Sequence, residues 1–190
     1  MRFRSLALAS IFINFMAGAG QAHALDWTVN PDKSFVQFAG TESGNAFTGK
    51  IGAFQSVVSF DPNDAEHSSA LLTFSMESAR TGTATYDGAL SGSEWLNVAK
   101  FPEATFTCTS FTKDKEGEYT VHGTFKLLGI EKKLDLPFHF TQGADKVATV
   151  DASFPLKRLE YGIGQAADAK AEWVSDAITV TVHLEASPKS

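Results

Sequence analysis

The sequence predicts an all-β protein, an antiparallel β-barrel of about eight strands with one or two short helices. Two observations carry this prediction. Apolar and polar residues alternate along several segments, and turn-forming residues separate those segments at a spacing that suits hairpins. With 16 phenylalanines in 190 residues, the chain is also rich in rings that need no hydrogen-bond partner.

The clearest alternation covers residues 119–127, 130–140 and 178–185. In the third segment, Ile178 and Val180 share one face while Thr179 and Thr181 share the other, as a strand with one apolar face requires. Weaker alternation predicts further strands, at residues 33–39, 54–60, 72–76, 104–111 and 150–156.

One apolar face per strand is typical of an antiparallel sheet. Closing eight such strands into a barrel removes exposed edges, and a β-sandwich is the main structural alternative. The strands at 119–127 and 130–140 exceed the usual length of about 5–6 residues, which suggests a lengthened barrel.

Two segments lack the alternation. Within residues 83–99, Ser91 or Ser93 is expected to cap a short helix that runs to Val98. Residues 161–173 contain two glycines and several alanines, and they are expected to form a long loop over a barrel mouth.

The first residues have the three-part pattern of a secretory signal peptide. Arg2 and Arg4 precede an apolar run of about 15 residues, and Ala22-His23-Ala24 fits the small-x-small pattern before a cleavage site. That run is shorter than the ~20 residues of a membrane-spanning helix. The sequence therefore predicts a signal peptide at 1–24, one domain at 25–190, and a periplasmic location.

The amino-acid composition limits the kinds of partner and covalent cross-link that are expected for this protein. The 22 acidic residues outnumber the 16 basic ones, a net charge of −6, which argues against nucleic acid because phosphate binding needs a basic face. The single cysteine, Cys108, excludes an internal disulfide and is expected to be a buried, inert thiol.

Sequence motifs of catalysis and metal binding are not found. His122, His139 and His183 fall on the polar faces of their strands, so they and His67 are expected to be solvated surface histidines. Residues 61–66 superficially resemble a calcium loop, but a turn explains their Asp, Asn and Pro content. We therefore expect neither a metal site nor enzymatic activity.

The apolar face itself remains as the candidate site. The ligand-binding candidates are the inward phenylalanines and the tryptophan that ends the expected mouth loop: Phe38, Phe54, Phe60, Phe74, Phe106, Phe125, Phe138, Phe140, Phe154 and Trp173. The rings either fill the core of a small barrel or leave an apolar channel among them. Small inward residues at Gly123 and Ala152 would make room for a channel.

Six blocks of sequence are informative as an ordered set, beginning with Trp-Thr-Val-Asn-Pro-Asp-Lys-Ser-Phe-Val-Gln-Phe. They are residues 27–38, 47–54, 60–62, 89–106, 123–138 and 156–164. Together they resemble the YceI-like family of bacterial periplasmic proteins, across about residues 26–186. One departure is Lys33-Ser34, where the family usually has His-Ser.

The resemblance implies an elongated, lipocalin-like barrel whose hydrophobic channel binds an isoprenoid lipid, either a polyprenyl phosphate or an isoprenoid quinone, without catalysis. Three alternatives stay open: an accessory quinone-binding partner of an inner-membrane b-type cytochrome, a small enzyme using the same cavity, and a structural domain with a filled core. A homodimer also stays open. Lys157, Arg158 and Lys170 lie near the expected mouth, where ordinary surface charge is favoured over contact with a headgroup.

Overall fold

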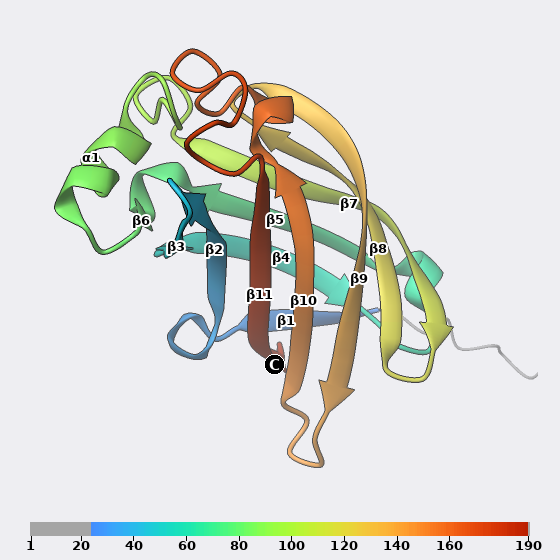
Figure 1. The fold of residues 1–190 in the computed structure, drawn as a ribbon. Coiled ribbons are helices and arrows are strands. Elements are labelled where there is room, and N and C mark those ends of the chain that lie inside the picture. Colours follow the sequence, from blue (N-terminus) through green and yellow to red (C-terminus); the bar gives the residue numbers. More distant parts are fainter. Residues whose placement is uncertain (1–23, 190) are drawn as a thin grey trace, which may run out of the picture.

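The computed structural model describes residues 24–189, and the predicted signal peptide falls almost wholly outside these residues. The described chain forms one closed antiparallel sheet, with one α-helix, α1 (Ala84–Ser91), at one end (Figure 1). The strands are β1 (Leu25–Val29), β2 (Phe35–Glu42), β3 (Asn45–Ile51), β4 (Phe54–Phe60), β5 (Ser69–Ser75), β6 (Ala79–Arg80), β7 (Glu103–Lys115), β8 (Glu118–Leu127), β9 (Ile130–Gln142), β10 (Ala148–Lys157) and β11 (Ala177–Pro188).

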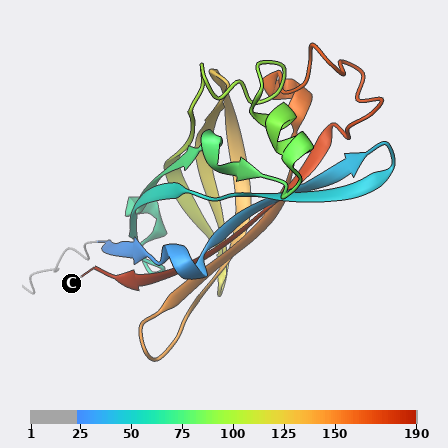
Figure 2. The same cartoon turned by 90° about the vertical axis from the view of Figure 1, so that its left-hand side faces the viewer.

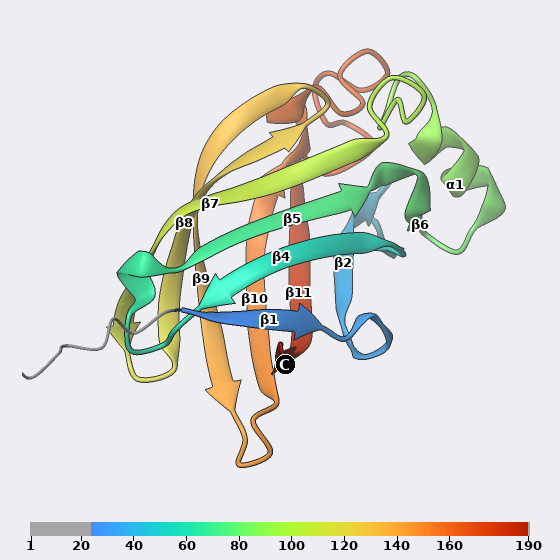
Figure 3. The ribbon, with the colours of Figure 1, turned by 180° about the vertical axis from the view of Figure 1, so that it is seen from behind.

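These segments make an eight-stranded barrel, because three of the strands are bent and each contributes two segments. The pairs β1–β2, β3–β4 and β5–β6 each continue in one direction across a short break, and the barrel closes where β1 pairs with both β4 and β11 (Figure 3). Every pairing is antiparallel. The all-β barrel predicted from the alternation is therefore confirmed.

The three breaks lie at neighbouring positions of the sheet, and hydrogen bonds join two of them. Pro31 opens a 3-10 helix between β1 and β2, where it cannot donate to a ladder. Gly52 and Ala53 separate β3 from β4, and a 3-10 helix at Met76–Ser78 separates β5 from β6. The Gly52 N–H donates to the Ser78 carbonyl at 3.1 Å, and the Ala53 N–H to the Ser78 hydroxyl at 2.9 Å. Beyond this bend the chain leads to α1.

The long strands carry the predicted alternation. In the β10–β11 pair, Ala152 lies opposite Val182 and Phe154 opposite Val180, all on the inner face. At 13 residues each, β7 and β9 exceed the expected lengths, and β11 has 12. Longer strands lengthen the lumen they enclose.

A cluster of aromatic rings closes one end of the barrel, which we call the closed end. Phe60 lies at its centre, with ring centroids 5.2 Å from Phe111, 5.4 Å from Tyr119 and 5.2 Å from Phe140. The two polar ring groups are satisfied by backbone carbonyls, since the Trp27 indole donates to Phe60 at 2.9 Å and the Tyr119 hydroxyl to Pro62 at 3.2 Å. The cluster is thus a dry, well-packed floor.

The opposite end, which we call the open end, carries α1, the tip of the β2–β3 hairpin and residues 158–176 (Figure 2). The expected helix from Ser91 or Ser93 to Val98 was wrong: the helix ends at Ser91, and turns follow it. The Asp87 carboxylate accepts from the Thr81 N–H at 2.6 Å and the Thr81 hydroxyl at 2.7 Å, which fixes the start of the helix. Gly92 then caps its last turn.

Candidate functional site

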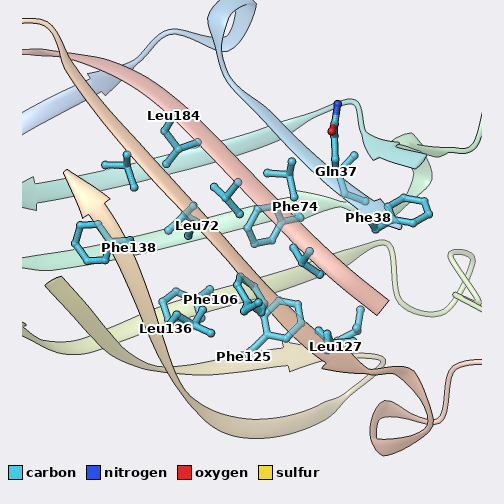
Figure 4. A pocket seen from close by; sticks show the side chains of 18 of the residues that line it. Gln37, Phe38, Leu72, Phe74, Phe106, Phe125, Leu127, Leu136, Phe138 and Leu184 are labelled. Carbon is cyan, nitrogen blue, oxygen red and sulfur yellow. The ribbon is translucent and has the colours of Figure 1, made fainter. Parts of the chain in front are cut away.

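The barrel encloses an apolar cavity of about 310 Å³ that extends from the closed-end floor toward the open end. Apart from tryptophan, Gln37 and Arg158 are the lining residues with polar side chains, and the Gln37 side chain is exposed (Figure 4). The lumen is therefore hollow and apolar. This excludes the alternative that the side chains fill the core of the barrel completely.

Two phenylalanine rings leave the lumen free because they fold flat over glycines in the wall. A side chain at Gly123 would start 2.4 Å from Cζ of Phe106, and one at Gly49 would start 2.2 Å from Cζ of Phe38. Only glycine allows such close approach of a ring to the strand. Mid-barrel inward residues such as Phe125 and Phe154 are only half-buried, because they border empty space.

Eight of the ten predicted ligand-binding residues line this cavity. They are Phe38, Phe60, Phe74, Phe106, Phe125, Phe138, Phe140 and Phe154. Phe60, Phe138 and Phe140 belong to the closed-end floor, while Phe74 and Phe125 lie side by side in the wall with ring centroids 6.4 Å apart. Contact of these rings with a ligand stays a prediction.

Phe54 and Trp173 do not line the cavity. Phe54 opens β4 directly after the Gly52–Ala53 bend, and it borders a separate hollow between β1 and β4. Trp173 is 61% exposed. The Asp168 carboxylate accepts the backbone N–H groups of Glu172, Trp173 and Val174, at 2.8, 3.3 and 2.9 Å, and this fixed loop turns the indole outward.

The alternation missed the lining that comes from irregular segments. Leu90 in α1, Trp95 and Leu96 beyond it, and Ile163 and Val174 in the expected mouth loop all line the cavity. In the sequence, these apolar residues follow neither the period of a strand nor that of a helix. Periodicity therefore could not predict which of them face the cavity.

Arg158 was expected to be an ordinary surface charge near the mouth, and this expectation was wrong because the side chain is buried. Only 1% exposed, it lies at the open end of the cavity and donates to the Asp168 carboxylate at 2.7 Å. It also donates to the carbonyls of Ile163 at 2.8 Å, Val174 at 2.8 Å and Ser175 at 3.2 Å. The guanidinium therefore joins both ends of the mouth loop. Lys157 and Lys170, in contrast, are exposed as expected.

The Asp168 carboxylate is stabilised in its charged form. The hydrogen bond from the Val174 N–H is the main reason that the pKa of Asp168 lies below its ordinary value. The N–H groups of Glu172 and Trp173 and the charge of Arg158 act in the same direction, while burial opposes them. The buried pair of Arg158 and Asp168 thus carries no net charge, and its hydrogen bonds are made to each other and to the backbone of the mouth loop.

The Tyr161 hydroxyl is a buried polar group without a hydrogen-bond partner among the described residues. Its ring packs edge-on against Phe125, with centroids 5.6 Å apart. Burial raises the pKa of this phenol, so the hydroxyl stays protonated.

The outer face holds the histidines. His122, His139 and His183 each contact one carboxylate on a neighbouring strand, Asp135 at 2.7 Å, Glu118 at 3.2 Å and Asp151 at 2.6 Å. Within residues 24–189, no three His, Cys, Asp or Glu side chains are grouped closely enough to hold a metal ion.

Cys108 is half-buried beside a bulge in β7, and burial raises the pKa of its thiol. Among the described residues, no helix has the length and apolar character needed to cross a membrane.

Known proteins resemble this chain in sequence along most of its length. The chain is 31% identical over 168 residues to Protein YceI of Escherichia coli O157:H7, covering 82% of this chain and 85% of the relative. It is 32% identical over 143 residues to a UPF0312 protein of Yersinia enterocolitica, covering 73% and 74% of the two chains.

Solved structures share the fold. BcnA of Burkholderia cenocepacia superposes with a TM-score of 0.80 at 25% identity, covering 83% of this chain and 99% of that one. A polyisoprenoid-binding domain from Saccharophagus degradans superposes with a TM-score of 0.69 at 16% identity, covering 87% and 99%. The family model for the YceI-like domain matches residues 27–186. The chain therefore belongs to the YceI-like family.

Proposed function

We propose that this protein binds the tail of an isoprenoid lipid inside its barrel and carries that lipid through the periplasm without altering it chemically. The observation that carries the proposal is the hollow lumen, which has an aromatic floor and walls of phenylalanine and aliphatic side chains. The signal-peptide pattern in residues 1–24 supports the periplasmic location. The name of the related Saccharophagus domain supports an isoprenoid ligand.

The physics of tail binding favours reversible carriage. Each buried methylene gains about 0.8 kcal/mol relative to water, so a tail of several isoprene units has a strong reason to leave water. A membrane interior is about as apolar as the barrel lumen. The free-energy difference between membrane and barrel is then small, and the lipid can be loaded and released.

The charges at the open end favour an uncharged headgroup, as in an isoprenoid quinone, over a polyprenyl phosphate. Arg158 is the charged side chain that borders the cavity, and Asp168 already neutralises it. Lys157 and Lys170 are exposed and lie 3.9 Å from Glu160 and Glu172 respectively. A phosphate drawn into the mouth beside Arg158 would lose hydration without gaining an unpaired cation there. A quinone headgroup is uncharged, so it needs no unpaired cation at the mouth.

The lining also supports binding rather than catalysis. A nucleophile or general base must lie within hydrogen-bond reach of a reacting atom. Among the lining residues, Arg158 is engaged in its ion pair and the Gln37 side chain is exposed. The apolar wall positions a tail, and it offers no group with which to transform one.

Native mass spectrometry of the protein purified from the periplasm tests the proposal. We expect a bound apolar species whose mass fits an isoprenoid quinone, and lower occupancy in a Phe125→Trp variant that keeps its circular-dichroism spectrum. Protein that stays ligand-free, and that takes up no isoprenoid quinone from detergent solution, would contradict the proposal. Turnover of an added isoprenoid quinone would contradict its non-catalytic part.

A further inference from the structure

Apolar side chains surround the open end of the barrel on its outside. Within residues 24–189, seven large hydrophobic side chains are exposed, and three of them lie in the connections at this end. They are Tyr86 in α1, Ile130 at the turn between β8 and β9, and Trp173 in the loop before β11, exposed by 45%, 39% and 61%. We call these three side chains the rim.

The rim side chains are attached to a braced framework. The Trp173 carbonyl accepts the Ser43 N–H at 2.7 Å, and Val174 pairs with Glu42 in an isolated β-bridge. The Tyr86 hydroxyl lies 3.4 Å from the Glu42 carboxylate, so helix and loop both meet the β2–β3 hairpin tip. Arg158 and Asp168 fix the inner side of the same loop. The exposed rings are therefore held in place.

The rim is continuous with the lumen. Leu90, one turn after Tyr86 in α1, lines the cavity, and so does Val174, which follows Trp173. Leu127, at the end of β8 before the turn that carries Ile130, lines it as well. In each of the three segments, an exposed apolar residue thus lies within four residues of one that lines the lumen.

We propose that the rim is a membrane-docking surface, which enters the headgroup layer of a bilayer with zwitterionic lipids and holds the barrel opening against it. The proposal rests on the proposed function, because a lipid carried by this barrel must pass between bilayer and lumen. Tryptophan and tyrosine suit the interface, since each has an apolar body and a polar tip. Docking here spares the isoprenoid tail a passage through water.

The charges around the rim favour zwitterionic rather than anionic lipid. Lys170 lies 3.9 Å from Glu172 on the loop, and Glu42 lies between Tyr86 and Trp173. The whole chain has a net charge of −6. Lys126 and Lys132, on either side of Ile130, form ion pairs at 3.1 and 3.0 Å with Glu131 and Glu160. Much of the attraction to anionic headgroups is therefore neutralised, and binding depends mainly on the inserted side chains and little on salt.

A bilayer also fits the layout of the rim better than a protein partner does. The three side chains come from three separate segments around one opening, with polar residues between them. A protein interface needs a contiguous, complementary face, whereas a fluid headgroup layer adapts to separate insertion points.

Vesicles of phosphatidylcholine, with and without a long-chain isoprenoid quinone, provide the test. We expect the full protein to sediment with the vesicles at low and high salt, and to take up quinone from them. Trp173→Ala should weaken vesicle binding by about tenfold, because it removes one inserted aromatic side chain, and should slow uptake similarly. Quinone supplied in detergent should still load the variant fully, since Trp173 does not line the cavity.

Val57→Ala is the matched control, because Val57 is 73% exposed on β4, away from the rim. It should bind vesicles and take up quinone like the parent protein. Equal vesicle binding by Trp173→Ala and the parent would overturn the docking proposal. So would a parent protein that loads from detergent but ignores vesicles, a result that would favour delivery by a protein partner. Failure to load even from detergent would instead contradict the proposed function.

Discussion

Partly filling the lumen should weaken tail binding strongly while leaving the barrel intact. Ala152 lies in the middle of β10 and lines the cavity, whereas its neighbour Ser153 faces outward and is exposed. In Ala152→Phe, the added ring occupies on the order of 100 Å³, roughly three times the ~30 Å³ share of a water molecule. That is a large part of a cavity of about 310 Å³.

The lost space corresponds to roughly four buried tail carbons. At about 0.8 kcal/mol per methylene, binding should weaken by about 3 kcal/mol, or more than 100-fold. Titration of delipidated protein with an isoprenoid quinone, followed by quenching of intrinsic fluorescence, measures the change. Ser153→Phe adds the same ring outside the barrel and should bind like the parent. Equal affinity of the two variants, both folded by circular dichroism, would refute the assignment of the lumen as the binding site.

Three further predictions concern stability and titration. Phe60→Ala should cost about 3–5 kcal/mol in a denaturant titration, because Phe60 is buried at the centre of the closed-end floor, whereas exposed Val57→Ala should change stability by less than about 0.5 kcal/mol. The Asp64 hydrogen bond raises the pKa of His67 above 6.5, so this pair stabilises the fold below that pH and the contribution is lost as the pH rises through the raised pKa; an NMR titration should show Asp64→Asn returning the value toward 6.5. The lowered pKa of Asp168 contributes stability above pH 3.8 that is lost as the pH falls through the lowered pKa, so Asp168→Asn should be less stable than the parent at neutral pH in urea titrations, with a smaller difference near about pH 3. Equal stability of parent and Asp168→Asn at neutral pH would contradict that reasoning.

The regular parts of the fold were predictable because side chains alternate between the two faces of a strand, so apolar residues recur every two positions when one face is exposed to solvent. That period placed Phe125, Phe154 and Val182 on the inner face, and the structure confirms all three. It failed at the end of a strand: Phe54 has the same phase as Val58 and pairs with Phe74, but it is the first residue of β4 and lies beyond the cavity.

The open end was harder to predict because its contacts join distant parts of an irregular chain. An arginine beside a lysine suggested surface charge, and only the folded loop brings Asp168 and three carbonyls around Arg158. Trp173 was correctly placed in a loop, but its direction depends on the hydrogen bonds that Asp168 accepts from the backbone. The hollow itself depends on Phe106 lying over Gly123, a cross-strand contact that composition does not reveal.

A crystal structure of the protein loaded with an isoprenoid quinone tests the central claim most directly. We predict continuous tail density along the lumen beside Phe125 and Phe154, ending above the floor around Phe60, with the headgroup near Arg158. Density confined to the outer surface, with the lumen empty or closed by rearranged side chains, would contradict it.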